Sequence, residues 1–381
     1  MEWIFGRGGY VLMTNIRRAL QAAAAGVGGD PALWFWGGNG SGQGGLGNTT
    51  NYSSPVQVGS LSTWVEIAST NTNGFGIRSD GLIFSWGINS DGQLGLGNTT
   101  NYSSPKQIGA LTNWALLSGG SSMVAAVKTD GTMWSWGRGA GGRLGHGNTD
   151  SYSSPVQIGA LTTWSKIFCR GEFSAAIKTD GTLWTWGANG SGQLGVGNTT
   201  YYSSPVQVGA LTTWSTVGIG SSHMGAIKTD GTLWMWGRGK YTGALGLGNT
   251  TNYSSPKQVG SLTDWAKISC SGLITMAVKT DDTLWAWGDG NNYATGLGVT
   301  TDYSSPVQCG TDTDWASVVT RSSSGLALKT DGSLFAWGLN SSGQLGDGTT
   351  ETKTSPVQIG SIAAWTRIAG VNSTGAAIQG E

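Results

Sequence analysis

Short apolar runs alternate with Gly-, Asn- and Asp-rich stretches along this chain, and one unit shows how they are arranged. In SAAIKTDGTLWTWG (174–187), two apolar runs flank Asp180–Gly181. An Asp-Gly step between two such runs is typical of a tight β-hairpin turn. In the second run Trp184 and Trp186 fall on one face and Leu183 on the other, which is the period-2 alternation of a strand. The unit therefore contains a hairpin with one tryptophan-bearing face.

Two further runs flank this hairpin. WSKIFC (164–169) precedes it, and PVQVG (205–209) follows a long loop rich in Gly and Asn. Pro205 heads the last run, which suits the start of an edge strand, because no hydrogen-bond donor of the ladder is lost there. The unit is therefore predicted to be a four-stranded antiparallel sheet.

The whole unit recurs along the chain. The Trp of its Trp-Gly pair returns every 50 residues, with one step of 51, at Trp36, Trp86, Trp136, Trp186, Trp236, Trp287 and Trp337. A second Trp keeps the same spacing, at Trp64, Trp114, Trp164, Trp214, Trp265, Trp315 and Trp365. Seven units of four strands predict an all-β fold, a seven-bladed β-propeller that occupies residues 28–381.

The two ends of the repeated region are predicted to complete one blade together. The chain ends in TGAAIQGE, which matches the first strand of the hairpin and stops where the turn is due. GGDPALWFWG (28–37) supplies the missing partner, with Asp30 in the turn and Trp34 and Trp36 in the paired tryptophan positions. The last blade then takes two strands from each end of the chain, which closes the ring and removes its open edges.

These residues resemble a known family. The blocks AIKTDGTLWTWGANGSGQLGVGNTT (176–200) and SPVQVG (204–209) are similar to the repeats of the RCC1 (regulator of chromosome condensation) family, over roughly nine-tenths of the chain. The resemblance implies a seven-bladed propeller but selects no function, because RCC1-like propellers serve as exchange factors, light sensors, ligase modules and virion parts. The nearly constant period leaves no room for the insertion that exchange activity uses, and the Gly-Trp-Arg-His-Thr string of the plant ultraviolet receptors is absent.

Composition narrows the classes of partner. Only 11% of the residues are charged, against about 25% in an average protein, and Gly accounts for 66 of 381. Lys plus Arg and Asp plus Glu both total 21, so no global basic field favours nucleic acid. The longest apolar candidate for a signal core is YVLM (10–13), so neither membrane insertion nor a Sec signal is expected.

Catalytic, metal and cofactor sites are not expected. Cys169, Cys270 and Cys309 have neither disulfide nor metal-ligand spacing and are expected to be small buried residues. With His146 and His223 as its only histidines, the chain has too few ligands for a zinc or haem site. No Ser lies in a Gly-x-Ser-x-Gly elbow with a His and an acid partner. The recurrent aspartates are explained by the hairpin turn of each unit: Asp80, Asp130, Asp180, Asp230 and Asp331.

Differences between the units gather in two sets of loops. In such a blade the loop between strands one and two and the loop between strands three and four emerge on one face of the ring. Their sequences vary, whereas the hairpin turns and interblade links of the other face are nearly uniform. Variation on one face of a rigid scaffold is typical of a binding surface, with unselected drift of exposed loops as the alternative. The candidate partner-binding residues are Arg138, Arg143, Arg170, Glu172, Phe173, His223, Arg238, Lys240, Tyr241, Asp289, Asn292, Tyr293 and Arg321.

Residues 1–27 differ in kind from the repeats and form a predicted tail. TNIRRALQAAAAG (14–26) has a Thr-Asn capping step, good helix formers and a Gly stop, which predict a short helix. A helix of that length needs a partner surface, so the segment is a candidate anchor, with a frayed tail as the alternative. Met13 is an alternative initiator, and MTNIRRALQ then resembles the start of tailed-phage virion proteins. The anchor residues are Ile16, Arg17, Arg18 and Leu20.

Two classes of function fit these expectations. In the first, the N-terminal segment binds a capsid or tail protein, and the propeller is displayed on a virion surface as a decoration or as an adhesin for a host-surface protein or glycan. In the second, the protein is a cytoplasmic RCC1-like adaptor that binds a small GTPase or a chromatin component. The low charge, the nearly verbatim repeats and the Asn-, Ser- and Thr-rich loops favour the first class.

Overall fold

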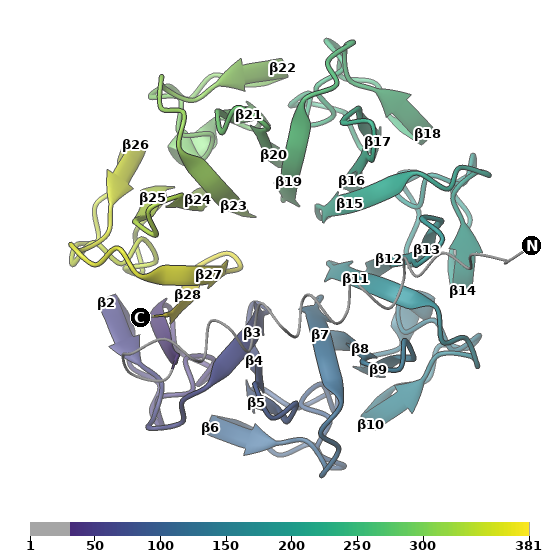
Figure 1. Ribbon diagram of the computed structural model, residues 1–381, viewed down its shortest axis with the longest axis vertical. Coiled ribbons are helices and arrows are strands. Elements are labelled where there is room, and N and C mark those ends of the chain that lie inside the picture. The colour runs from purple at the N-terminus through teal and green to yellow at the C-terminus, as the bar shows by residue number, and fades with distance from the viewer. Residues whose placement is uncertain (1–30, 381) are drawn as a thin grey trace, which may run out of the picture.

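A computed structural model describes residues 31–380, which form a ring of seven four-stranded antiparallel sheets (Figure 1). The predicted seven-bladed β-propeller is confirmed. Within these residues the helical content is limited to two short 3-10 turns, η1 (Ala140–Gly142) and η2 (Asn291–Tyr293). No helix in this part of the chain is long and apolar enough to cross a membrane. The predicted tail with its four anchor residues, and Asp30, lie outside the described residues.

We number the blades from the one whose innermost strand is β3. The strands of blade 1 are β3 (Trp64–Ser69), β4 (Asn73–Arg78), β5 (Ile83–Gly87) and β6 (Tyr102–Gln107). Those of blade 2 are β7 (Trp114–Gly119), β8 (Met123–Lys128), β9 (Met133–Gly137) and β10 (Tyr152–Gln157). Blade 3 comprises β11 (Trp164–Arg170), β12 (Phe173–Lys178), β13 (Leu183–Gly187) and β14 (Tyr202–Gln207). Blade 4 comprises β15 (Trp214–Ile219), β16 (His223–Lys228), β17 (Leu233–Gly237) and β18 (Tyr253–Gln258).

The remaining three blades follow the same order. Blade 5 comprises β19 (Trp265–Ser271), β20 (Ile274–Lys279), β21 (Leu284–Gly288) and β22 (Tyr303–Gln308). Blade 6 comprises β23 (Trp315–Arg321), β24 (Ser324–Lys329), β25 (Leu334–Gly338) and β26 (Lys353–Gln358). Blade 7 comprises β27 (Trp365–Ala369), β28 (Thr374–Gln379), β1 (Ala32–Gly37) and β2 (Tyr52–Gln57). In Figure 1 the first strand of each blade lies nearest the axis and the fourth lies at the rim.

The hairpin predicted around Asp180–Gly181 is present as β12 and β13, which pair from Phe173 with Gly187 to Ile177 with Leu183. Trp184 and Trp186 contribute to the core shared with blade 2, whereas Leu183 contributes to the core shared with blade 4. The alternation read from the sequence thus assigns each face of a blade to a different neighbour, and the cores of the protein lie between blades.

Pro205 does not head its strand, which corrects the sequence expectation. The strand β14 begins at Tyr202, three residues earlier, so Pro205 lies inside it. The strand tolerates a proline there because the register of its pairing with β13 shifts between Thr185 and Gly187. Because β14 is the outermost strand and is irregular at this point, the missing backbone N–H removes no ladder hydrogen bond.

Blade 7 is shared between the two ends of the propeller, as predicted. The strand β28 pairs with β1, and the sheet order is β2-β1-β28-β27. Leu33 pairs with Ile378 in the same register as the hairpin pairs of the other blades. The ring is therefore closed by backbone hydrogen bonds rather than by a covalent bond.

A tryptophan hydrogen bond joins each blade to the next. The indole Nε1 of Trp186 donates to the backbone carbonyl of Arg143, in the long loop of blade 2, over 2.9 Å. The same bond occurs at all seven interfaces, with lengths between 2.8 and 3.1 Å. A buried indole N–H without an acceptor is costly, so these bonds fix the relative position of neighbouring blades. The nearly constant Trp-Gly spacing is explained by this repeated interface.

Candidate functional site

The variable loops meet on one face, which we call the loop face; the hairpin turns lie on the opposite face. The side chain of Arg143 demonstrates this arrangement, because it starts in the loop between strands three and four of blade 2. Its Nη1 donates to the carbonyl of Ser121, between strands one and two of the same blade, over 3.1 Å. Its Nη2 lies 2.9 Å from Oε1 of Glu172, in the corresponding loop of blade 3. The predicted pairing of the two loop sets is therefore present.

Four of the thirteen predicted binding residues are buried, which removes them from direct contact with a partner. Arg143 is 3% exposed, and Phe173, His223 and Arg321 are completely buried. Phe173 belongs to the core between blades 3 and 4. His223 Nε2 lies 3.1 Å from the hydroxyl of Thr275 in blade 5, and burial, followed by the charge of Arg170, lowers the pKa of His223 to about 4.

Arg321 stabilises the framework through backbone carbonyls. Its Nη1 donates to Gln344 over 2.6 Å and to Thr374 over 3.2 Å, and its Nη2 donates to Gly325 over 3.1 Å. Burial lowers the pKa of Arg321 to about 9, so the guanidinium remains cationic at neutral pH. Its charge is compensated by carbonyl dipoles from blades 6 and 7, and it holds these blades together.

Two exposed candidates, Lys240 and Tyr241, lie in the long loop of blade 4 beside the half-buried Arg238. Tyr241 is 64% exposed, with the guanidinium carbon of Arg238 at 5.4 Å and the ammonium of Lys240 at 4.9 Å from its ring centroid. Tyr241 has φ +85°, a value that L side chains rarely adopt. The single 51-residue step between Trp236 and Trp287 falls in this repeat. The extra residue therefore produces a protruding aromatic flanked by two cations.

The other predicted residues lie on blades 2, 3 and 5. Arg138 and Glu172 are exposed on blades 2 and 3, and Arg170 is half-buried near the axis. On blade 5, Asn292 is exposed and Asp289 and Tyr293 are half-buried.

Charge is unevenly distributed over the loop face. The loops of blades 2, 3 and 4, including Arg170 at the end of β11, carry five cations and two carboxylates, a net charge of 5 − 2 = +3: Arg138, Arg143, Arg170, Arg238 and Lys240 against Asp150 and Glu172. The loops of blades 5, 6, 7 and 1, counted with Arg321 and with Lys353 at the start of β26, carry 2 − 5 = −3: Arg321 and Lys353 against Asp91, Asp289, Asp302, Asp347 and Glu351. We call the first region the basic sector. The total charge of zero gives no indication of this basic sector.

A small pocket lies where the short loops of the blades converge on the axis; we call it the axial pocket. Its volume is about 90 Å³. Six blades line it, with Arg170 as the only charged side chain: Thr70, Asn71, Gly119, Gly120, Ser121, Arg170, Gly171, Ser221, Ser322, Val371 and Asn372. Asn372 Nδ2 donates to Asn71 Oδ1 over 2.7 Å across the closing seam. Sequence reasoning selected Arg170 but missed its neighbours, because they look like ordinary Gly, Ser and Asn loop residues.

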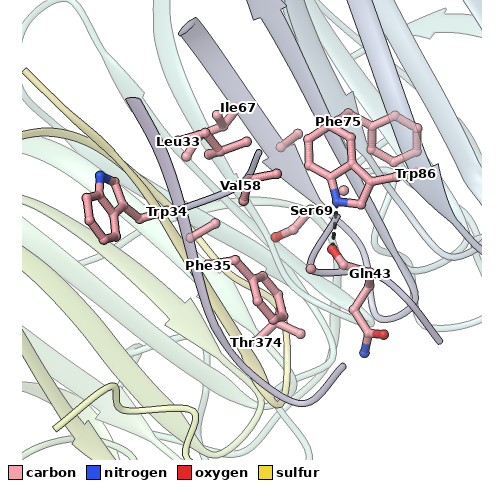
Figure 2. A pocket seen from close by; sticks show the side chains of 14 residues that line it. Leu33, Trp34, Phe35, Gln43, Val58, Ile67, Ser69, Phe75, Trp86 and Thr374 are labelled. Carbon is pink, nitrogen blue, oxygen red and sulfur yellow. Dashed lines mark hydrogen bonds between the residues drawn. The ribbon is translucent and has the colours of Figure 1, made fainter. Parts of the chain in front are cut away.

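A second cavity, between blades 7 and 1, is a packing void. Figure 2 shows Phe35 and Trp86 beside it, with the Trp86 indole bonded to the carbonyl of Gln43. Its volume of about 10 Å³ is at the lower limit for one water molecule, so it holds no ligand. Gly44 stands here where blade 1 has Leu94, and a Cβ on Gly44 would lie 2.6 Å from the Phe35 ring. Phe35 thus fills the space of the missing leucine.

One Ser–His contact requires attention as a candidate for catalysis. His146 Nε2 lies 2.9 Å from Ser135 Oγ, and that hydroxyl donates to the carbonyl of Leu144 over 2.7 Å. The single hydroxyl proton of Ser135 is used in the bond to the carbonyl. His146 Nε2 is therefore the donor in its contact with Ser135 and does not act as a base towards that hydroxyl. Ser85 and Thr185 make the same carbonyl bond in blades 1 and 3 without a histidine. The contact is therefore structural.

The cysteines are buried and unpaired, as the sequence suggested. Cys169, Cys270 and Cys309 are 7%, 2% and 2% exposed, and burial raises the pKa of each thiol to about 12. Thiols of this kind are unreactive at neutral pH. Within residues 31–380, no group of three or more His, Cys, Asp or Glu side chains could hold a metal ion.

Known proteins resemble this chain mainly in fold. The crystal structure of human WBSCR16 is 17% identical, with a TM-score of 0.82, and the match covers 93% of this chain and all of that one. The crystal structure of Prp20p from Saccharomyces cerevisiae, described with its binding to Gsp1p and histones, is 17% identical, with a TM-score of 0.80 over 92% of each chain. Yeast RCC1 (Prp20), solved with bound Kap60, gives the same identity and TM-score over 92% of this chain and 89% of that one. No curated protein sequence matches the chain.

The family model for the regulator of chromosome condensation (RCC1) repeat matches more than half of the chain. The matched residues are 80–127, 130–177, 180–227, 230–278 and 331–377, and a second RCC1 repeat model matches 164–193. Most of these units start at a hairpin-turn aspartate and end in the second strand of the next blade, so each sequence repeat spans two blades. That offset explains why the first and last strands of the propeller share one blade. The chain therefore belongs to the family of RCC1-repeat β-propellers.

Proposed function

We propose that this protein is a non-catalytic adaptor whose loop face binds an acidic surface of a protein partner. The observation that carries the proposal is the basic sector on blades 2 to 4, with the exposed Tyr241 between Arg238 and Lys240. Tyr and Arg are enriched in protein interfaces, because each presents a large contact area and directed hydrogen bonds. A positive sector also steers an acidic partner during encounter.

The structural relatives support an adaptor role. Prp20p is described with its binding to Gsp1p and histones, and in another crystal structure the same protein is bound to Kap60. A protein of this fold thus binds several other proteins. Small GTPases and chromatin components remain the candidate partners of the present chain. Among them, the basic sector favours a protein that presents carboxylates on its surface.

The virion hypothesis draws on a different part of the molecule. It rests on segment 14–26, which lies outside the described residues, and on the low charge of the repeats. The structural relatives named above provide no support for it. Co-sedimentation with candidate virus particles, comparing the full chain with a version that starts at Gly28, tests this hypothesis separately.

The adaptor proposal is tested with two double variants that each lose two positive charges, one inside the basic sector and one outside it. Arg238→Gln/Lys240→Gln removes two cations of the basic sector, and Lys106→Gln/Lys257→Gln removes two exposed cations from the outer strands β6 and β18. Proteins captured by the full chain are identified and purified, and their affinity for each variant is measured. We expect the first double variant to lose about tenfold in affinity and the second to match the wild type. Equal affinities of the two double variants would contradict the proposal.

A further inference from the structure

Three arginines, Arg143, Arg170 and Arg321, lie among the loop-face candidates, and Arg170 has the fewest hydrogen-bond partners of the three. Arg143 is paired with Glu172, and Arg321 donates to three carbonyl contacts. Arg170 stands at the position equivalent to Arg321, six residues after the first Trp of its blade. Within residues 31–380, the Nη2 of Arg170 donates to the hydroxyl of Ser271, and Arg170 forms no ion pair with a carboxylate. A guanidinium has five N–H donors, so most of those of Arg170 remain available.

The local sequence holds Arg170 across the ring. Its partner Ser271 belongs to blade 5, so the side chain passes over blade 4, where the equivalent residue is Gly220. A Cβ on Gly220 would lie 2.3 Å from the ring of His223, so that position has no room for a side chain. The glycine leaves a path for Arg170, and Ser271 fixes its end. The guanidinium is thereby preorganised, which reduces the entropy lost on binding.

The surroundings of Arg170 suit an oxyanion. The axial pocket has no Asp or Glu in its lining and offers hydroxyl and amide groups from Ser121, Ser221 and Asn71. Partial burial lowers the pKa of Arg170 to about 10, which still leaves it cationic at neutral pH. Arginine in a partly desolvated site binds carboxylates through two parallel N–H···O bonds.

The size of the pocket limits what enters it. Its volume of about 90 Å³ is smaller than the roughly 150 Å³ cavity that admits benzene, so it accommodates a carboxylate group rather than a nucleotide or a sugar. The pocket lies at the centre of the loop face and borders the basic sector through Arg170. A ligand that spans both therefore presents one inserted acidic group and further carboxylates around it.

We infer that the axial pocket is a subsite for the side-chain carboxylate of an Asp or Glu on a protein partner, with Arg170 as its anchor. The inference rests on the proposed function, because it specifies how an acidic partner docks on the loop face. The partner's acidic side chain enters the pocket, and its carboxylate accepts hydrogen bonds from the unpaired donors of Arg170.

A peptide titration tests this subsite without knowledge of the natural partner. The probe is a short fluorescein-labelled peptide of alternating Gly and Glu, with a Gly-Gln peptide as the uncharged control, and binding to the full chain is measured by fluorescence anisotropy. Arg170→Gln removes the cation. Ser221→Tyr keeps every charge but fills the pocket, and Lys257→Gln is the matched loss of one cation outside the pocket, on the outer strand β18. Thermal unfolding of each variant shows that it is folded.

We expect Arg170→Gln and Ser221→Tyr each to weaken binding of the Glu peptide by about tenfold, the effect of losing a charge-assisted hydrogen-bond pair. Lys257→Gln should bind like the wild type. Excess sodium acetate should displace the Glu peptide from the wild type. Unchanged affinity in either pocket variant would overturn the inference, as would binding of acetate at Arg170 with no entry of the peptide.

The basic-sector variant separates this inference from the proposed function. If Arg238→Gln/Lys240→Gln weakens peptide binding while Arg170→Gln does not, the adaptor proposal stands and the axial subsite is overturned. If the effect of Arg170→Gln persists in the background of that double variant, the subsite stands by itself, whatever the role of the sector.

Discussion

Trp36 and Gln344 are 308 positions apart in the sequence, yet the indole Nε1 of one donates to the backbone carbonyl of the other over 2.9 Å. This bond joins β1 to the long loop of blade 6, beside the β1–β28 pairing that closes the ring. Consecutive blades use the same bond between residues 43 positions apart, for example Trp236 and Gln193, also over 2.9 Å. The interface between the first strand of the propeller and blade 6 therefore uses the same tryptophan bond as the interfaces between consecutive blades.

The first prediction concerns these bonds. Trp36→Phe and Trp236→Phe each remove one indole donor and leave a buried carbonyl with one partner fewer. We expect both to lower the free energy of unfolding by at least about 1 kcal/mol, and by similar amounts. Urea unfolding followed by circular dichroism measures this. A stable Trp36→Phe beside a destabilised Trp236→Phe would show that the closing interface contributes little.

The second prediction concerns the exchange of volume between Phe35 and Gly44. Phe35→Ser empties the seam between blades 7 and 1 and should cost about 3 kcal/mol or more. Gly44→Leu alone should also destabilise, because even its Cβ would lie 2.6 Å from the Phe35 ring. The double variant reproduces the Ser85–Leu94 pair of blade 1 and should recover much of the loss. A double-mutant cycle measures the coupling, and simple additivity of the two losses would contradict the account.

The third prediction concerns acid stability and His223. Burial holds the pKa of His223 at about 4, against 6.5 for an unperturbed histidine, so the unfolded chain binds this proton more tightly. The stability that depends on a neutral His223 is complete above pH 6.5 and is lost as the pH falls towards 4. His223→Met introduces the residue found at the equivalent position of blade 2, Met123. This variant should remove up to about 3 kcal/mol of the pH dependence of stability.

Unfolding free energies measured between pH 7 and 4 compare the two proteins. His146→Gln is measured alongside them, because burial also lowers the pKa of the half-buried His146. Parallel pH profiles for wild type and His223→Met would show that His223 protonates without cost in the fold.

The fourth prediction concerns the hairpin turns. Asp180 Oδ1 accepts from the hydroxyl of Thr182 over 2.6 Å and from its backbone N–H over 2.9 Å, and these bonds lower the carboxyl pKa. The stability they supply is present above the ordinary pKa of 3.8 and is lost as the pH falls through the lowered value. Asp180→Asn should flatten the acid limb of the stability profile, whereas Asp150→Asn, in an exposed loop, should not. The same steepness in both variants would exclude this role for the turn.

The repeat made most of the fold predictable from the sequence, and particular residues show why. The strands β12 and β13 follow local signals in the sequence, namely the alternation of Leu183 and Trp184 and the turn at Asp180–Gly181. Pro205 was misplaced because the preceding Tyr-Ser-Ser run has no apolar alternation to mark it as a strand.

The binding face was less predictable for a physical reason. Arg143, His223 and Arg321 are polar and stand in variable loops or at strand ends, so they were expected to face a partner. Their partners are backbone carbonyls or side chains in neighbouring blades, at sequence distances that no local pattern reveals. The axial pocket could not be predicted for the same reason, because Asn71 and Asn372 come into contact only after the ring closes.

The most direct test of the central claim is a map of backbone protection in the complex of the full chain with a purified, identified protein partner. Hydrogen–deuterium exchange should show protection in the long loops 138–151 and 238–252 of the basic sector, and none in the hairpin turns 179–182 and 229–232. Protection of the hairpin turns, with the loops of blades 2 and 4 unaffected, would contradict a loop-face adaptor.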